Sequence, residues 1–227
     1  TATTFQTYTI TDSDTTGTYT CTLAGDDSAD FTASISGKVC TVVWAAAPDY
    51  DSPADTGGNN VYDITIAFSD GTNDLAAQTT AVTVTDTNDQ TPAATVASTY
   101  TQAEAASTAW QTFTITDSDT TGTYTCTVAG TDSADFSSSI SGKVCTIAWA
   151  AAPDYEAPAD DGGGNVYDIT IAFSDGTNDL AAQTTAVTVT DANDQTPAAT
   201  VASTYTQAEA TATTFQTYTI TDSDTTG

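Results

Sequence analysis

Residues 86–92 have the sequence DTNDQTP, and residues 191–197 repeat it as DANDQTP after a step of 105 positions (86 to 191). The first copy follows an alternating run that contains Val82 and Val84, and the second copy follows the same pattern, which is typical of a β-strand with one buried face. Each copy ends in a proline, which cannot donate a hydrogen bond to a strand ladder and favours an extended exit. Carboxylate and amide oxygens are ligands that calcium prefers. We therefore predict a cation-filled joint between two domains at each copy.

The rest of the chain repeats with the same step and without insertions. The motif TDSDTTG occurs at residues 11–17, 116–122 and 221–227. The paired cysteines, the two lysines and the pair Trp44 and Trp149 keep the same spacing. A period of this length corresponds to a whole domain rather than to one turn of a solenoid.

We expect three parts in this sequence. Residues 1–91 form a repeat without its N-terminal strand, residues 92–196 form a complete repeat, and residues 197–227 begin a third. Because residues 211–227 are identical to residues 1–17, we interpret the sequence as a segment of a longer tandem array, with a superperiod of two repeats as one arrangement. In the alternative, residues 197–227 complete the first domain of the next molecule by strand donation.

The composition restricts the possible partners. Of the 227 residues, 30 are acidic and two are lysines, and the absence of arginine and histidine leaves a net charge of -28. A nucleic-acid-binding surface is excluded because it needs basic residues, and anionic membrane surfaces are disfavoured for the same reason. No stretch approaches the roughly 18 to 20 apolar residues that span a bilayer, so we expect no direct membrane insertion. Inorganic cations are the natural partners.

Each repeat carries two cysteines at the same spacing, Cys21 with Cys40 and Cys126 with Cys145. Without histidine or a CxxC pair, two thiolates per domain are too few for a zinc site. We predict one disulfide inside each repeat, which implies a location outside the reducing cytosol, extracellular or at the cell surface. Two buried free thiols per domain are the alternative.

The complete repeat has about seven short segments with strand character. They have threonine-rich outer faces, are separated by turns rich in Gly, Pro and Asp, and show no helical period longer than one turn. The clearest strands are predicted at residues 110–115, 123–128, 143–149, 166–173 and 184–190. Residues 93–104 are predicted to be an extended entry segment. This pattern predicts an all-β fold of tandem antiparallel, immunoglobulin-like β-sandwiches of about 100 residues each.

With these landmarks in order, the repeat resembles the cadherin domain along nearly its whole length, and in particular the cadherin-like repeats of prokaryotic surface proteins. The matching motifs of the complete repeat are Glu104 of the first strand, Asp117-Ser118-Asp119 for DxD, Asp154-Tyr155-Glu156 for DYE, Asp175 after the Tyr-x-Ile-x-Ile-x-Phe strand, and residues 191–197 for DxNDNxP. Nothing resembles the strand-swap tryptophan of adhesive cadherins, so the resemblance does not carry cell–cell adhesion over to this chain.

The resemblance implies calcium sites at the joints, with ligands carried over residue by residue. The first joint would use Asp49, Asp51, Asp86, Asn88, Asp89, Asp117, Asp119 and Asp175. The second joint would use Glu104, Asp154, Glu156, Asp191, Asn193, Asp194, Asp222 and Asp224. A third, upstream joint is suggested by Asp12, Asp14 and Asp70. In the alternative, the acids form a solvated, halophile-like surface, which is also what we expect of Asp132, Asp135, Asp160 and Asp161.

The sequence favours a structural function over an enzymatic one. It has no histidine to act as a general base, no Cys–His pair, no glycine-rich phosphate loop and no GxSxG motif. Lys38 and Lys143 are expected to face solvent beside a turn, although an intramolecular isopeptide bond is a second possibility. We predict an extracellular fibre or surface stalk of tandem repeats, rigidified by calcium and disulfides, whose partners are neighbouring copies of the repeat in one long chain or in a homopolymer. The alternative is an adhesin stalk whose ligand-binding domain lies outside this segment.

Overall fold

The computed structural model describes residues 4–14, 16–104, 108–207, 209 and 216–224. These residues form two compact units, the first comprising Thr1–Asn88 with Ser118–Thr121 and the second comprising Asp89–Asp117 with Gly122–Gly227. Thr15 and residues 225–227 of the TDSDTTG motifs lie outside the described residues. The predicted domain limits at residues 91 and 196 stay a prediction.

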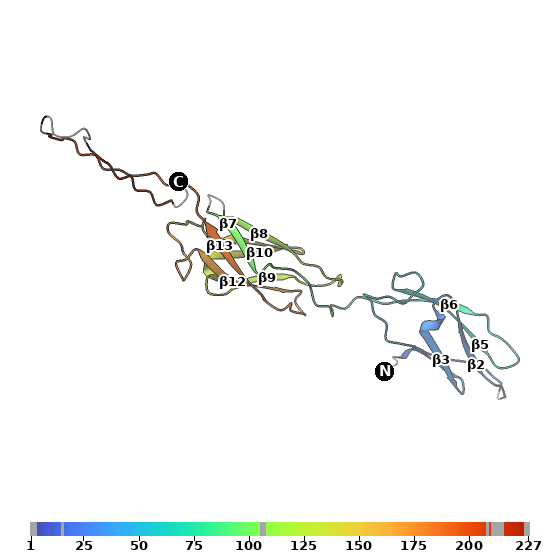
Figure 1. The fold of residues 1–227 in the computed structure, drawn as a ribbon. Helices are drawn as coiled ribbons and strands as arrows, with labels where there is room; N and C mark the ends of the chain where they lie inside the picture. Colours follow the sequence, from blue (N-terminus) through green and yellow to red (C-terminus); the bar gives the residue numbers. More distant parts are fainter. Residues whose placement is uncertain (1–3, 15, 105–107, 208, 210–215, 225–227) are drawn as a thin grey trace. The chain divides into compact units, whose positions relative to one another are not determined.

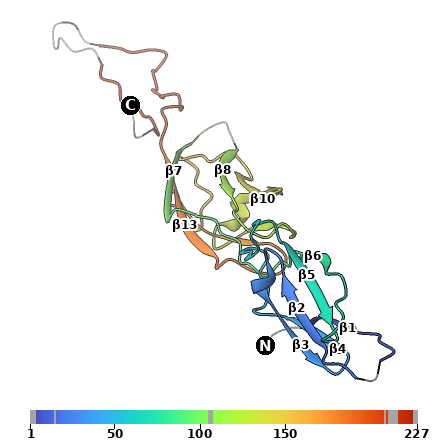
Figure 2. The same ribbon diagram turned by 90° about the vertical axis from the view of Figure 1, so that its right-hand side faces the viewer.

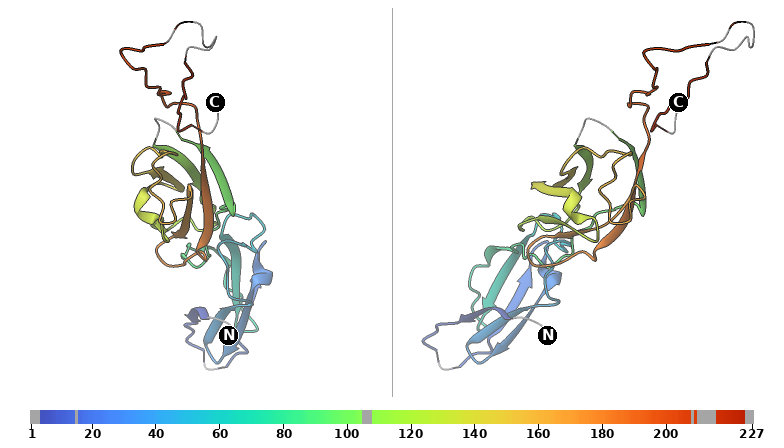
Figure 3. Two further views of the ribbon diagram at one scale, coloured as in Figure 1. Left: turned by 60° about the vertical axis from the view of Figure 1, so that its left-hand side comes forward. Right: turned by 90° about the vertical axis from the view of Figure 1, so that its left-hand side faces the viewer.

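The second unit is a sandwich of two sheets. All its strand pairs are antiparallel except that β7 runs parallel to β13, and these two strands lie side by side in Figure 3. One sheet has the order β7-β13-β12-β9 and the other has the order β10-β11-β8. The strands are β7 (Thr99–Ala103), β8 (Ala109–Thr114), β9 (Thr125–Ala129), β10 (Phe136–Ser141), β11 (Val144–Trp149), β12 (Val166–Ser174) and β13 (Gln183–Thr190).

The first unit repeats this sandwich with one strand fewer among its described residues. Its sheets have the orders β1-β4-β3 and β2-β5-β6, and Figure 2 shows β2 beside β5. The second of these sheets has no strand that corresponds to β7 in the part of the chain that the structure describes. The strands are β1 (Thr4–Thr9), β2 (Thr20–Ala24), β3 (Phe31–Ser36), β4 (Val39–Trp44), β5 (Val61–Ser69) and β6 (Gln78–Thr83).

Alternation of apolar and polar residues builds the core of each sandwich. In β12, Tyr167, Ile169 and Phe173 point inward while the polar residues between them face away from the core. Phe136 packs on Trp149 with ring centroids 4.2 Å apart, and the equivalent pair of the first unit has the same separation. The predicted all-β sandwich with seven strands in the complete repeat is therefore confirmed. In the described part of the chain, helix is limited to single 3₁₀ turns at η1 (Ser28–Asp30) and η2 (Ser133–Asp135).

The entry segment of the complete repeat is more ordered than predicted. Residues 93–104 were expected to be merely extended, but Thr99–Ala103 forms β7 and pairs with β13 over five residue pairs, from Ala186 opposite Thr99 to Thr190 opposite Ala103. The sequence TYTQA has only one large apolar residue, so its pattern alone does not indicate a strand. The partner strand supplies the hydrogen bonds that order it.

Two acids predicted to be surface charge are instead buried in loops. Asp132 is 5% exposed and accepts hydrogen bonds from the backbone N–H groups of Asp161 (2.8 Å) and Asp168 (2.6 Å). Asp160 is 7% exposed and accepts from the N–H groups at residues 164 and 165 (2.9 and 3.0 Å). Burial of Asp135 beside these two carboxylates raises its pKa. The surface prediction was wrong for Asp132 and Asp160 because these carboxylates accept hydrogen bonds from backbone N–H groups of the loops and of β12.

Each unit contains one disulfide that joins its two sheets. Cys126 of β9 bonds to Cys145 of β11 with the Cα atoms 5.9 Å apart, and Cys21 of β2 bonds to Cys40 of β4 with the Cα atoms 6.1 Å apart. Cys126, Cys145 and Cys40 belong to the hydrophobic cores, and Cys21 packs against the core of the first unit. The predicted disulfide within each repeat is confirmed. Among the described residues, no helix combines the length and apolar character that a bilayer-spanning segment needs.

Reduction of the disulfides is expected to lower the thermal stability of both units. Each bond closes a loop with a sequence separation of 19 residues, which corresponds to about 3 kcal/mol of unfolding free energy in the chain-entropy model. The Cys126→Ser/Cys145→Ser double variant should lower the melting temperature of the second unit. Calorimetry of the parent chain with and without a reductant, and of the variant, measures these changes. Equal melting temperatures with and without reductant would contradict this expectation.

Candidate metal centre

Five carboxylates from separate parts of the second unit converge on one place, which we call the Glu156 cluster. Glu104 follows β7, Glu156 lies in the loop after β11, Asp191 and Asp194 follow β13, and Asp224 lies near the C-terminal end of the chain. Ligand oxygens of Glu104, Glu156 and Asp194 lie within 4.8 Å of one another, and so do those of Glu156, Asp191 and Asp224. Glu156 is shared by both groups, so the two candidate positions are adjacent.

Glu104 holds the segments of this cluster together. It is 6% exposed, and one carboxylate oxygen accepts a hydrogen bond from the Tyr155 N–H at 2.6 Å while the other accepts from the Ala192 N–H at 2.7 Å. The Glu104 N–H in turn donates to the carbonyl of Thr190 at 3.0 Å, which continues the pairing of β7 with β13. One side chain thereby fixes both the loop that carries Glu156 and the segment that carries Asp191.

The surroundings of Glu156 disfavour the ionised form of its carboxylate. Both of its oxygens are shielded from solvent, and neither has a hydrogen-bond partner among the described residues. Burial of the carboxylate, followed by the negative charge of Glu104, raises the pKa of Glu156 to about 7, with Asp224 and Asp191 adding to the effect. A carboxylate of this kind needs either a proton or a cation.

A cation fits the donor set of the Glu156 cluster. Every contributing atom is a carboxylate oxygen, and one oxygen of Asp224 is also shielded and without a hydrogen-bond partner in the described part of the chain. The other oxygen of Asp224 accepts from the Gln195 N–H at 2.9 Å, which orients the group. The chain has no arginine or histidine that could neutralise these charges.

Three residues predicted for this second joint lie outside the two groups. Asp154 is exposed and accepts from the Ala157 N–H at 3.0 Å, so it stabilises the turn in front of Glu156. Asp222 is exposed and accepts from the Asp224 N–H at 3.3 Å. Asn193 is also exposed.

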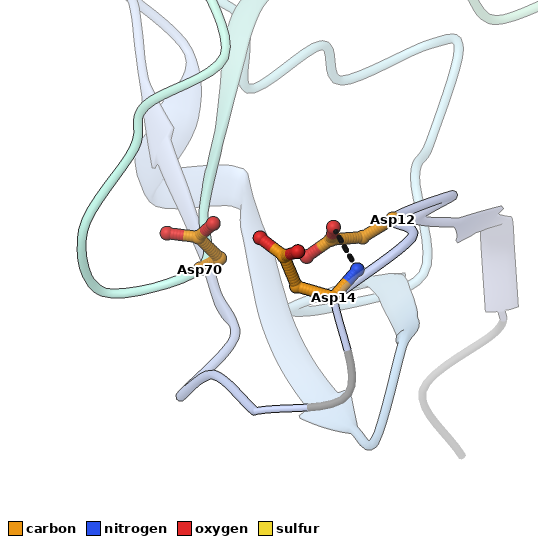
Figure 4. A group of neighbouring side chains, drawn as sticks. All are labelled: Asp12, Asp14 and Asp70. Atoms are coloured by element: carbon orange, nitrogen blue, oxygen red, sulfur yellow. Dashed lines mark hydrogen bonds between the residues drawn. The ribbon is translucent and has the colours of Figure 1, made fainter.

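A second acidic group lies in the first unit and contains Asp12, Asp14 and Asp70 (Figure 4). One oxygen from each lies within 4.8 Å of the others. Asp12 accepts from the Asp14 N–H and from the Tyr19 hydroxyl, both at 2.9 Å, and these bonds lower its pKa. The pKa of Asp70 is lowered first by its hydrogen bond from the Asn73 N–H. Both groups therefore stay ionised at neutral pH and remain suited to a cation.

The predicted first-joint residues within the first unit also approach one another. Asp86 accepts hydrogen bonds from the N–H groups of Thr120 (2.7 Å) and Thr121 (3.1 Å) and from the Thr120 hydroxyl, and these bonds lower its pKa, the Thr120 hydroxyl most. Oxygens of Asp51 and Asp119 lie within 4.8 Å. Burial, then the charges of Asp119 and Asp86, raise the pKa of Asp51.

The other residues predicted for the first joint differ in burial and in hydrogen bonding. In the second unit, oxygens of Asp117 and Asp175 lie within 4.8 Å, and Asp175 is 1% exposed and accepts from the N–H groups of residues 177 and 178, each at 2.7 Å. Asp89 is exposed and accepts from its neighbour Gln90 at 2.8 Å. Asn88 is half-buried, whereas Asp49 is exposed and accepts from the Asp51 N–H at 3.0 Å.

Sequence reasoning missed the contribution of the lysines. Lys38 donates to the carbonyls of Asp12 (2.6 Å) and Asp14 (3.2 Å) and lies 5.3 Å from the centre of the Tyr19 ring. Lys143 donates in the same way to the carbonyl of Asp117 at 2.9 Å. The prediction of simple solvent-facing lysines was therefore wrong, because each lysine anchors a TDSD loop. The constant spacing of 26 residues between Asp12 and Lys38 and between Asp117 and Lys143 was the available signal.

Comparison with solved structures identifies the fold. Over 87% of its residues the chain superposes with a TM-score of 0.63 on a structure entitled protocadherin gammaB7 EC3-6 cis-dimer, at 19% sequence identity. Over 91% it superposes with a TM-score of 0.61 on repeats EC21-23 of human CDH23, at 18% identity. The chain has a cadherin-like fold.

The similarity between this chain and these structures is a similarity of fold, because the sequence identity is low. The chain spans 45% of the matched protocadherin gammaB7 chain and 48% of a protocadherin gamma B2 chain that comprises repeats 3–6. No family model matches the sequence, and no curated protein matches it. The prokaryotic origin suggested by the sequence motifs stays a prediction.

The stability of the metal-free chain is expected to fall as the pH rises toward 7 because of Glu156. Its pKa is about 7 in the folded state against an ordinary value of 4.5, so the folded state binds the proton more tightly than the unfolded state does. The proton on Glu156 therefore stabilises the folded state fully below the ordinary pKa of 4.5, and this stabilisation is lost as the pH rises through the folded-state pKa of about 7. Melting temperatures measured in chelator between about pH 5 and about pH 8 should therefore decline more steeply than those of Glu156→Gln. Parallel pH profiles for the two proteins would refute this assignment.

Proposed function

We propose that this chain is part of an extracellular structural shaft in which calcium at the joints between repeats sets the stiffness of the array. The repeats are those of the sequence prediction, with joints at residues 86–92 and 191–197. The proposal assigns no catalytic role to the chain, and its partners are calcium ions and neighbouring copies of the repeat.

The convergence of the Glu156 cluster is the observation that carries this proposal. Glu104 comes from the body of the repeat, Asp191 and Asp194 come from the linker, and Asp224 comes from the segment after it. Mutual repulsion of carboxylates at this spacing opposes their assembly in water. A bound cation would convert that repulsion into attraction, and both shielded oxygens of Glu156 would then have a partner.

The donor set favours calcium over other metals. Calcium takes six to eight oxygen ligands in a flexible geometry, and carboxylates, backbone carbonyls and water supply them. Zinc prefers nitrogen and sulfur, but the chain has no histidine, and all four cysteines form disulfides. Glu104, Glu156, Asp191, Asp194 and Asp224 would hold the ion at the second joint. Asp51, Asp86 and Asp119 would contribute at the first joint, and Asp12, Asp14 and Asp70 at an upstream one.

The proposed mechanism is electrostatic. Without metal, the carboxylates of a joint repel one another and the adjacent repeats separate or flex. Calcium neutralises the charge and links the linker carboxylates to those of both flanking repeats, so the angle at the joint becomes fixed. The disulfide in each sandwich keeps the repeats themselves rigid and agrees with an oxidising, extracellular location. The extracellular repeats of the matched cadherin structures support the same location.

Calcium should raise the melting temperature of the chain and reduce its flexibility, because the ion binds only the folded joint. Glu156→Gln should weaken calcium binding at the second joint by at least about tenfold, since it removes the charge shared by both ligand groups. Titration calorimetry measures the affinity, and small-angle scattering in calcium and in chelator measures the change in dimensions.

The matched control is Asp161→Asn. Asp161 is an exposed acid of the same repeat, and the substitution removes the same charge outside the 4.8 Å groups. If the two variants lose calcium affinity equally, or if calcium changes neither the melting temperature nor the scattering, the acids are only a solvated surface and the proposal fails.

A further inference from the structure

The two lysines of the chain occupy equivalent places, and each holds a TDSD loop by its backbone. Lys38 donates to the carbonyls of Asp12 and Asp14 at 2.6 and 3.2 Å, and Lys143 donates to the carbonyl of Asp117 at 2.9 Å. Both lysine side chains are half-buried, and the carbonyls that they reach lie in loops rather than in strands. The only two basic side chains of an acidic protein are thus placed on main-chain oxygens of its loops.

A tyrosine beside each lysine holds the first carboxylate of the same loop. The Tyr19 hydroxyl donates to Asp12 at 2.9 Å, and the Tyr124 hydroxyl donates to Asp117 at 3.0 Å. The ring centroids of these tyrosines lie 5.3 and 5.2 Å from the lysine nitrogen atoms, which is within the range of a cation–π contact. Each loop is therefore fixed at two points, by a lysine at its backbone and by a tyrosine at a side chain.

A strand pair brings a further acid next to each of these loops. Figure 1 shows β9 beside β12, and Thr125 at the start of β9 lies opposite Ser174 at the end of β12. Asp175 directly follows β12, and its carbonyl accepts from the Thr123 N–H at 2.6 Å. The strand pair thereby places Asp175 next to Asp117, and the pairing of β2 with β5 has the same role in the first unit.

A lysine beside a proposed calcium site has two opposite effects on the bound ion. Its charge repels the ion, and solvent and salt weaken this repulsion because the side chain is only half-buried. Its hydrogen bonds keep the loop in one conformation, and loss of an outer-shell partner of this kind typically lowers metal affinity by about 10- to 100-fold. We expect the second effect to exceed the first.

We propose that Lys38 and Lys143 are positioning residues, which raise the calcium affinity of the acids in their TDSD loops although they add positive charge beside the site. This assignment rests on the proposed function, because it concerns the calcium sites of the joints. The lysine satisfies the loop carbonyls, so the carboxylates of Asp12 and Asp14 stay close to that of Asp70 (Figure 4). Calcium then binds a loop that is already ordered, and less conformational freedom is lost on binding.

The test compares Lys143→Met with the parent chain. The substitution keeps an unbranched side chain but removes its charge and its three donors. In a calcium titration followed by amide NMR resonances, residues 177–178 report on Asp175, to which their N–H groups donate, and Gln195 reports on the Glu156 cluster. Lys143→Met should lower the affinity read at residues 177–178 at least about tenfold and leave the affinity read at Gln195 unchanged.

Charge repulsion alone predicts a change of the opposite sign. Removal of a positive charge beside the site would then tighten calcium binding at residues 177–178. Lys143→Arg keeps both the charge and the donors, so it should retain most of the affinity that Lys143→Met loses. A lysine that only stabilises the fold would change the melting temperature but not the affinity measured well below it.

Amide exchange in chelator gives a readout that needs no metal. Lys143→Met should accelerate exchange at Thr123, whose N–H donates to the Asp175 carbonyl at 2.6 Å. Lys38→Met should do the same at Thr18, whose N–H donates to the Asp70 carbonyl at 2.8 Å. Each variant is the matched control for the other, because the substitution is identical and the two lysines lie in different units.

Two results would overturn the assignment of the lysines as positioning residues. One is that Lys143→Met binds calcium at residues 177–178 as tightly as the parent chain or more tightly, while Gln195 still responds to calcium. The other is that neither lysine variant changes amide exchange in its own loop. If calcium shifts none of these resonances in the parent chain, the proposed function itself fails, and the role of the lysines fails with it.

Discussion

The scarcity of positive charge governs how this protein is built. With 30 acidic side chains and two lysines, almost no buried carboxylate can be neutralised by an ion pair. Backbone N–H groups take that role instead. Asp132 binds the N–H groups of residues 161 and 168, and Glu104 binds those of residues 155 and 192. Both lysines are used to anchor TDSD loops. Carboxylates without such donors, Glu156 above all, need a proton or a cation to compensate their charge. The presence or absence of backbone donors thus distinguishes acids with a structural role from candidate metal ligands.

The pairing of β7 with β13 connects the core to the candidate metal centre. Val96, which precedes the strand, belongs to the core, and Glu104, which directly follows the strand, belongs to the Glu156 cluster. The same segment therefore completes the hydrophobic sandwich and orders the ligands of the joint.

Much of the fold follows from local patterns. Alternation in stretches such as residues 166–173 predicts strands with one buried face, and the equal spacing of the cysteines predicts a disulfide in each sandwich; the structure confirms both predictions. Thr99–Ala103 was missed as a strand because its order comes from its partner and not from its own apolar pattern. The candidate ligands were chosen by their resemblance to family motifs. A motif gives the order of residues along the chain but not the distances between their side chains. Their assignment as calcium ligands therefore stays a prediction.

The sequence by itself determined the repeat, the all-β class, the disulfides and the set of acids available to a cation, because each depends on residue type and spacing. Only the tertiary structure distinguished Asp132 and Asp160, which accept from backbone N–H groups, from Glu156, whose oxygens have no hydrogen-bond partner among the described residues. It alone also showed that Lys38 and Lys143 donate to backbone carbonyls of the TDSD loops. The physical reason is the same in both cases. Hydrogen-bond satisfaction and burial depend on what a distant segment places beside a residue.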